Sequence, residues 1–349
     1  MSEELEKLKK YIEANLDKTD VAIGLHSTPD PDAIASGLGL SRILTHLNPK
    51  IQTKILYTGE ISHVQNRTMV NVLNIPLVKM DDVEDITAFD IYCTVDCTPE
   101  RSFPKEITEC LITIDHHKND TKKSEIVDIR HVGSTASIIW EYMNELGIKL
   151  DESEDDDSVI ATALVLGIRT DTQNLVSENT TDLEYRATQS LMPIVNKQHL
   201  TSIEDYPIPS YFFDLRSRLD NKDNVFSEGS LFIGGIGYIS PSRRDVIPAM
   251  ADERKRMEGV ETAIVFAVVD DHIEVSVRSQ SVSVDVNDLC QKIFGKEHGG
   301  GKSGAGAAKV PLGFLSMNQH IPDMIKDKMW DAVKALMFDK IQHVCIGNS

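Results

Sequence analysis

Four short segments of the chain concentrate side chains that can bind a metal ion. In chain order they supply His26, Asp30, Asp32, Asp96, Asp115, His116, His117 and Asp171. Carboxylates brought close together repel one another unless cations lie between them. Oxygen and imidazole ligands without a thiolate suit manganese best, with magnesium, cobalt or iron as alternatives. If these segments meet in space, we expect a divalent metal centre.

The residues before these segments indicate how they could meet. Apolar runs typical of strands end directly before the first three segments, at Val21–Leu25, Ile91–Val95 and Leu111–Ile114. With a further run at Ile51–Tyr57 and helical stripes between the runs, the pattern predicts an α/β domain with a mostly parallel sheet and helices on both faces. The carboxyl ends of parallel strands share one edge, where ligands bind. The first three segments are therefore expected at one edge.

Asp171 has a different setting, because it follows an apolar helical run that ends at Ile168. An earlier helix is expected over Ser134–Leu146, where Gly133-Ser134-Thr135 could cap the helix or present amides to an anion; capping is the favoured interpretation. A single aspartate after a strand is usually a turn or cap residue. Only the complete set, in this order, indicates a metal site.

The set also resembles the signature motifs of a known family. His26-x-x-x-Asp30-x-Asp32, Asp96, Asp115-His116-His117 and Asp171 look like the four motifs of the DHH phosphoesterase superfamily. The resemblance implies two cations, one held by His26 and Asp30, the other by Asp32, His116 and Asp171, with Asp96 bridging them. It also implies that Asp115 orients a neighbour and that His117 faces the scissile phosphate or assists proton transfer.

The second half of the chain predicts a smaller α/β domain. Strands are expected at Ser230–Ile239, Thr262–Val269 and His272–Arg278, with a hairpin turn between the last two, followed by helices at Val286–Phe294 and Ile321–Val344. The C-terminal helix is interpreted as core or as a contact between two copies of the chain. We expect a catalytic domain over 1–190, a helical connector over 191–228 and a substrate-binding domain over 229–349, with the active site in a cleft between the two domains.

This second half resembles the DHH-associated C-terminal domain. The resemblance implies substrate contacts from Arg278, Ser279, His298, Gly299, Gly300, Gly301 and Lys302. The glycines at Gly299–Gly306 read as a loop whose N–H groups can approach a phosphate. They do not follow a strand as a dinucleotide-binding motif must, and Lys296 stands where a Walker A loop needs glycine. The sequence departs from the family at Lys302, where histidine is common, and at Gln173, where glycine is frequent.

Composition limits the possible functions. The 349 residues suggest about two domains, and the net charge of −19 opposes a large footprint on duplex nucleic acid. No stretch approaches the roughly 18 apolar residues of a membrane span, and the N-terminus lacks the apolar core of a signal peptide. Five cysteines without CxxC spacing indicate neither a disulfide framework nor a zinc ribbon. We expect a cytoplasmic protein.

The motifs and length resemble the stand-alone nanoRNase and oligoribonuclease branch of the superfamily. The implied function is a manganese-dependent phosphodiesterase that cleaves short RNA, especially linear dinucleotides such as pGpG or pApA, to 5′-mononucleotides. Four alternatives stay open: a cyclic-dinucleotide phosphodiesterase, a pAp phosphatase, a pyrophosphatase, and a nucleotide sensor that binds without cutting. Neither the polarity of cleavage nor the base preference follows from the sequence. A homodimer is a possible assembly.

Overall fold

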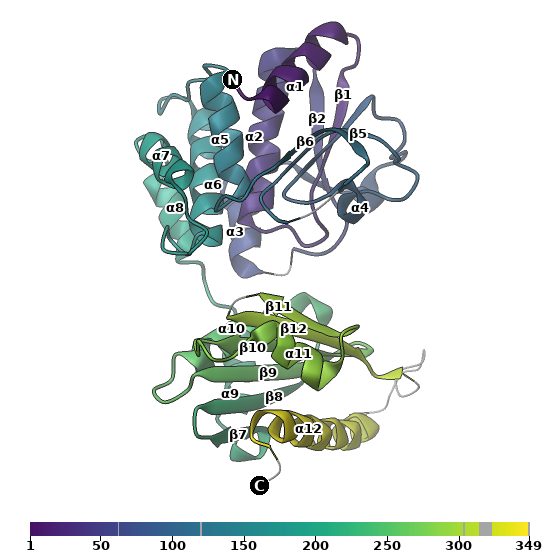
Figure 1. The fold of residues 1–349 in the computed structure, drawn as a ribbon, viewed down its shortest axis with the longest axis vertical. Helices are drawn as coiled ribbons and strands as arrows, with labels where there is room; N and C mark the ends of the chain where they lie inside the picture. Colours follow the sequence, from purple (N-terminus) through teal and green to yellow (C-terminus); the bar gives the residue numbers. More distant parts are fainter. Residues whose placement is uncertain (62, 119–120, 303, 314–322, 348–349) are drawn as a thin grey trace. The chain divides into compact units, whose positions relative to one another are not determined.

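The chain divides into two units, residues 1–207 and 208–349, each with its own sheet (Figure 1). The computed structural model describes residues 1–61, 63–118, 121–302, 304–313 and 323–347. The division falls inside the segment 191–228 that we expected to connect two domains. Helix α8 (Lys197–Glu204) packs into the core of the first unit, and helix α9 (Ser210–Arg218) packs into the second.

The first unit is built on a six-stranded parallel sheet in the order β3-β2-β1-β4-β5-β6. Its strands are β1 (Asp20–Gly24), β2 (Gln52–Tyr57), β3 (Leu77–Lys79), β4 (Ile91–Val95), β5 (Cys110–Asp115) and β6 (Ser124–Ile129). The mostly parallel sheet predicted from the apolar runs is confirmed. Strands β3 and β6 were not predicted, because β3 has only three residues and the apolar residues of β6 are interrupted by Asp128 and so form no continuous run.

Helices cover the two faces of this sheet unequally. One face packs against a large core formed mainly by α1 (Glu3–Ala14), α2 (Pro31–Leu47), α3 (Val64–Val72), α5 (Thr135–Glu145), α6 (Asp155–Asp171), α7 (Asp182–Leu191) and α8. Ala22 and Leu56 point to the other face, where a smaller cluster includes Phe103, just after the short helix α4 (Pro99–Ser102). Neighbours such as Ile23 and Ile55 point into the large core, as the two-residue period of a strand requires.

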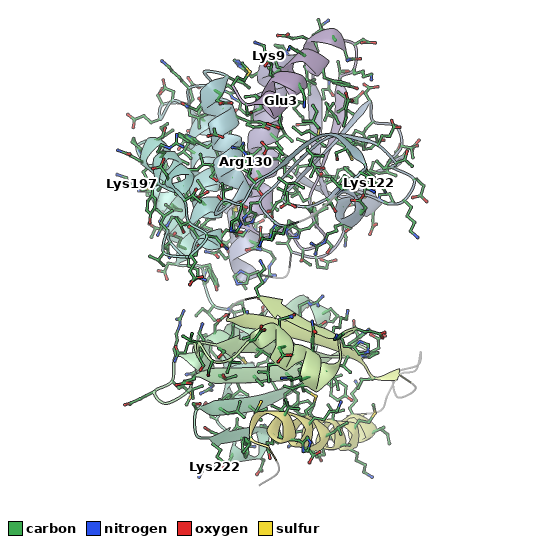
Figure 2. All side chains as sticks on the ribbon, viewed as in Figure 1. Glu3, Lys9, Lys122, Arg130, Lys197 and Lys222 are labelled. Atoms are coloured by element: carbon green, nitrogen blue, oxygen red, sulfur yellow. The ribbon has the colours of Figure 1, made fainter. Side chains whose placement is uncertain are left out.

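Side-chain ion pairs tie the edge strand β6 to helix α5. Arg130, labelled in Figure 2, donates to both carboxylate oxygens of Asp128 at 2.8 Å and forms an ion pair with Glu141 of α5. The Tyr142 hydroxyl donates to Asp128 at 2.7 Å. Arg130 therefore has a structural role at the start of the segment that leads into α5.

The second unit has a mixed sheet in the order β11-β12-β10-β9-β8-β7, with only β8 and β9 parallel among the described pairs. Its elements after α9 are β7 (Val225–Glu228), β8 (Leu231–Ile239), α10 (Val246–Lys255), β9 (Thr262–Val269), β10 (His272–Ser279), α11 (Val286–Phe294), β11 (Gly299–Lys302), β12 (Ala305–Pro311) and α12 (Asp323–Cys345). The predicted hairpin is present, because Val269 pairs with His272.

Two details differ from the sequence expectations. Asp171 is the last residue of α6 and does not follow the helix, since the helical hydrogen bonds continue past the apolar run. The glycine segment is not a loop but forms the edge strand β11 and the start of its neighbour β12, and both strands pack against α11. The predicted start of the C-terminal helix at 321–322 lies outside the described residues, and α12 buries Val333, Met337 and Ile341 in the core.

No helix in the described part of the chain is both long enough and apolar enough to cross a membrane. All five cysteines lie among the described residues and all are free thiols.

Candidate metal centre

The predicted metal ligands lie together at the carboxyl edge of the first unit's sheet. Three of the four segments follow β1, β4 and β5, which are neighbours in the sheet, and the fourth is the end of α6. Nearest ligand atoms form three groups, in each of which all atoms lie within 4.8 Å of one another: His26, Asp30 and Asp96; Asp32, His116 and Asp171; and Asp96, His116 and His117. The six side chains that we expected to be neighbours are therefore neighbours.

The segment after β1 holds its carboxylates by starting a helix. Asp30 is the N-cap of α2 and accepts a hydrogen bond from the Ala33 N–H at 3.1 Å, and Pro31 occupies the first helical position. Asp32, one residue later, is completely buried. Asp30 is thus both a cap and a candidate ligand, since the Nε2 atom of His26 lies 3.8 Å from its Oδ1 atom.

Asp96 lies at the centre of the cluster. Its backbone has a φ of 58°, a left-handed conformation that turns the chain sharply at the end of β4, while its N–H still donates to the Ile114 carbonyl. The Oδ1 atom of Asp96 lies 3.6 Å from His116 Nε2, and its Oδ2 atom lies 3.7 Å from His26 Nε2. The two oxygens therefore face different histidines.

The three residues at the end of β5, Asp115, His116 and His117, have different hydrogen-bond partners. Asp115 is fully buried and accepts a hydrogen bond from the backbone N–H of His117, whose Nδ1 atom lies 2.9 Å from the same oxygen. The Nδ1 atom of His116 lies 3.2 Å from the Val132 carbonyl, so this ring nitrogen is the donor and Nε2 is directed to the cluster. Asp171 Oδ2 lies 3.2 Å from His116 Nε2.

The residues present fit a divalent cation. Among the described residues, His116 Nε2 is a buried nitrogen with no hydrogen-bond partner, although it lies within 4 Å of Asp32, Asp96 and Asp171. Buried polar atoms are nearly always hydrogen-bonded, so a buried imidazole nitrogen that has no such partner and is surrounded by carboxylates has the geometry of a metal ligand. Neutral imidazole together with carboxylate oxygens is a typical donor set for manganese or related metals.

The electrostatics of the metal-free cluster lead to the same conclusion. Burial raises the pKa values of Asp32 and Asp96 well above their ordinary value of 3.8, and the charge of Asp171 adds to the shift at Asp32. Burial lowers the pKa of His116, but the nearby carboxylates of Asp171 and Asp32 raise that pKa to about 9. The metal-free site therefore retains protons that a cation would displace.

The first residues of α5 donate hydrogen bonds to two carboxylates of the cluster, a role that the sequence did not predict. The backbone N–H groups of Thr135 and Ala136 donate to Asp32 at 2.7 and 2.8 Å. The Thr135 hydroxyl donates to Asp96 at 3.0 Å. The signal in the sequence is Gly133-Ser134-Thr135 at the start of the expected helix, for which a capping role is the favoured interpretation. Ser134 is indeed the N-cap of α5.

The candidate substrate residues lie in the second unit, at one end of three neighbouring strands. Ala305 of β12 pairs with Arg278 of β10 on one side and with Lys302 of β11 on the other, so these three residues point to the same side of the sheet. Arg278 Nε donates to Asp252 of α10 at 3.0 Å. The Ser279 hydroxyl is buried and bonded to Thr262, which leaves no exposed side-chain group at that position.

The remaining candidates follow α11. His298 is half-buried and is the last residue of the turn before β11. A Cβ atom on Gly299 would lie 2.6 Å from the Cys290 carbonyl oxygen, so this glycine is required for packing on α11. At Gly300 the nearest atom to an added Cβ, Asn287 Oδ1, is 3.6 Å away. The Gly301 N–H donates to Asn287. Packing on α11 therefore requires glycine at position 299, whereas position 300 has space for a Cβ atom.

Comparison with known proteins assigns both units to described domains. A model described as the DHH family, N-terminal domain, matches residues 20–168, and a model described as the DHHA1 domain matches residues 238–335. The first match contains every candidate metal ligand except Asp171, and the second contains every candidate substrate residue.

Three curated proteins align with most of this chain. An uncharacterized protein of Methanocaldococcus jannaschii, MJ1633, is 32% identical over 88% of this chain and 61% of its own length. PdeA of Listeria monocytogenes, a cyclic-di-AMP phosphodiesterase, is 27% identical over 78% of this chain and 42% of its own length. NrnA of Thermus thermophilus, a bifunctional oligoribonuclease and PAP phosphatase, is 24% identical over 88% of this chain and 90% of its own length. The chain spans less than two thirds of the first two relatives.

Proposed function

The chain belongs to the DHH phosphoesterase superfamily, and from this premise we propose that it is a two-metal phosphodiesterase that hydrolyses short oligonucleotides, especially linear dinucleotides, to 5′-mononucleotides. The relative NrnA supports this choice, because it is named as an oligoribonuclease and aligns with this chain over nearly the full length of both. The relative PdeA supports a cyclic dinucleotide as the alternative substrate, over a smaller share of both chains.

The position of Asp96 carries the proposal of two cations. Its oxygens face His26 on one side and His116 on the other, at 3.7 and 3.6 Å. In the proposed arrangement His26 and Asp30 hold one cation, Asp32, His116 and Asp171 hold the other, and Asp96 bridges them. A bound pair of divalent cations, most simply Mn²⁺, supplies Lewis acidity to the phosphoryl oxygens and lowers the pKa of water.

His117 is the proposed proton-transfer residue. It is one-third exposed, whereas the Asp115 carboxylate beside its Nδ1 atom is fully buried. A hydrogen bond from Nδ1–H to Asp115 fixes the ring plane and leaves Nε2 for the substrate. In the imidazolium form, the Nε2–H group can bind the scissile phosphate or donate its proton to the leaving oxygen. Asp115 acts as the positioning group for this ring.

The second unit is proposed to recognise the nucleotide. Arg278 and Lys302 point to the same side of its sheet, and both can pair with a phosphate. At Gly300 the nearest atom to an added Cβ is 3.6 Å away, so a base or phosphate can approach the backbone there. Ser279 contributes only its backbone, since its hydroxyl bonds Thr262. His298 and Lys302 are the proposed substitutes for the histidine that is common in the family after the glycines.

A product assay with defined substrates tests the proposal. Purified protein with Mn²⁺ is incubated with RNAs from the dinucleotide to a 24-mer, with cyclic dinucleotides, with pAp and with pyrophosphate, and metal content is measured on the same sample. We expect fastest turnover of linear dinucleotides such as pApA or pGpG, with release of mononucleotides. Faster hydrolysis of the 24-mer or of pyrophosphate would contradict the proposed substrate class. Binding of pGpG without any product would favour a nucleotide sensor.

A further inference from the structure

Helix α5 begins at a residue that contacts two carboxylates of the metal cluster at once. Thr135 is completely buried. Its backbone N–H donates to Asp32 Oδ2 at 2.7 Å, and its side-chain hydroxyl donates to Asp96 Oδ1 at 3.0 Å. The next N–H, of Ala136, donates to the other oxygen of Asp32. Among the described residues, the hydrogen bonds to the Asp32 carboxylate come from backbone N–H groups, whereas the hydrogen bond to the Asp96 carboxylate comes from a side-chain hydroxyl.

The Asp96 carboxylate needs such a partner because its own torsion preference is weak. The terminal torsion of an aspartate is broad and roughly two-fold, so the carboxylate plane is set by its surroundings. The left-handed backbone places the side chain in the cluster but does not determine this plane. With the Thr135 hydroxyl on Oδ1, the opposite oxygen lies 3.7 Å from His26 Nε2. The hydroxyl therefore selects the orientation in which the two oxygens face different histidines.

Hydrogen bonds to helix α7 fix the first turn of α5, which contains Thr135. Ser134 caps the helix by accepting the Ser137 N–H, and the Ser137 hydroxyl donates to the buried carboxylate of Glu184 in α7. The second oxygen of Glu184 accepts both the N–H and the hydroxyl of Thr181 at 2.7 Å. A Cβ on Gly133 would lie 2.6 Å from Thr172 and 2.9 Å from Glu184. The start of α5 is therefore closely packed and hydrogen-bonded on the side that faces α7.

We propose that Thr135 is a positioning residue whose hydroxyl fixes the plane of the Asp96 carboxylate, so that Asp96 can bridge two cations. The inference rests on the proposed function for the roles of those cations. Loss of a hydrogen-bonded partner behind a metal ligand typically weakens metal binding by about 10- to 100-fold. The same loss should alter the bridge between the two ions more than the binding of the first ion, because Asp32 keeps its backbone donors.

The experiment compares variants of the full chain that differ in one hydroxyl. Thr135→Val removes the hydroxyl at nearly constant volume, and Thr135→Ser keeps it. Thr162→Val is the matched control, because Thr162 is an equally buried helical threonine whose hydroxyl bonds Ser158 and Asn196, not a candidate ligand. Measured are Mn²⁺ stoichiometry and affinity by titration, the electron paramagnetic resonance signal of a coupled Mn²⁺ pair, and thermal unfolding of the metal-free protein.

We expect the wild-type protein, Thr135→Ser and Thr162→Val to bind two coupled Mn²⁺ ions. Thr135→Val should bind the second ion about 10- to 100-fold more weakly and lose the coupled signal. If Thr135→Val does not fold, Thr135→Ala provides the same measurement. Wild-type affinity and coupling in the variant without the hydroxyl would overturn the inference, as would failure of Thr135→Ser to retain them. Wild-type protein that binds coupled Mn²⁺ but hydrolyses no nucleotide would overturn the proposed function and leave the Thr135 result intact.

Discussion

At the scale of single residues, the candidate site depends on buried groups that would be unfavourable without a cation. Asp96 adopts a left-handed backbone, a conformation that costs of order 1–3 kcal/mol for most residues that are not glycine. Asp32 and Asp96 are buried carboxylates, and His116 carries a buried nitrogen without a hydrogen-bond partner. Such features concentrate where a site is organised for binding a ligand rather than for stability.

Replacement of His117 tests the proposed division of labour in the DHH segment. We expect His117→Gln to lower kcat by about 10²- to 10⁴-fold, the usual contribution of a positioned acid or base, with KM and metal content nearly unchanged. His46→Gln is the control, because His46 is an exposed histidine in the last turn of α2. Wild-type kcat in His117→Gln, measured with saturating Mn²⁺ and a linear dinucleotide, would exclude this role.

The raised pKa values of Asp32 and Asp96 predict the pH dependence of metal binding. Because each folded-state pKa exceeds the unfolded value near 3.8, the stability that these groups contribute to the metal-free protein is complete below that value and is lost as pH rises through the folded-state pKa. Mn²⁺ needs the deprotonated form. Binding should therefore release protons, and the metal-induced rise in Tm should grow from mildly acidic to mildly alkaline pH. Calorimetry in buffers of different ionisation enthalpy measures the release; a zero value contradicts the prediction.

At the scale of elements, the turns at strand and helix ends decide where the side chains point. After α6, Gln173, Asn174 and Leu175 have φ values of 50°, 61° and 67°. This left-handed run explains why glycine is favoured at the position of Gln173, since glycine adopts such a backbone without steric cost. In the second unit, the glycines of β11 allow this edge strand to lie directly on α11.

Two alanine substitutions in β11 separate packing from substrate binding. Gly299→Ala should destabilise the protein by about 1–3 kcal/mol, because its Cβ would meet the backbone carbonyl of Cys290 at 2.6 Å. Gly300→Ala should change the free energy of unfolding by less than about 0.5 kcal/mol, since its nearest neighbour is 3.6 Å away. Denaturant unfolding measures both. If the Gly300 backbone approaches the nucleotide, this second variant should raise KM several-fold; an unchanged KM would remove Gly300 from the substrate contacts.

At the scale of the whole molecule, the chemistry is divided between two units with separate cores. All candidate metal ligands, from His26 to Asp171, lie in residues 1–207, and Arg278 and the glycine strand lie in residues 208–349. The first core contains no residue of the second unit among the described residues. The candidate metal ligands and the substrate residues that we propose therefore belong to different units of the chain.

The fragment 1–207 should fold and bind Mn²⁺ with the affinity of the full chain, because every candidate ligand and every contact around Asp96 is retained. Its turnover of linear dinucleotides should fall sharply, since Arg278 and β11 are absent. Metal titration, circular dichroism and the product assay measure the three quantities. The full chain with Asp32→Ala is the control for lost metal binding. A folded fragment without Mn²⁺ affinity would show that the second unit contributes to the metal centre.

The sequence by itself determined the parallel sheet, its four longest apolar strands and the gathering of the acidic and histidine segments at one edge. Each of these follows from local information: apolar runs of strand length, and polar residues placed directly after them. Only the tertiary structure decided that Asp171 ends a helix, that the glycine segment forms two strands, and that the chain divides after Pro207. The contact of Thr135 with Asp96 is of the same kind, because it joins residues 39 positions apart. Such outcomes depend on which surfaces pack together, and no local pattern in the chain encodes that choice.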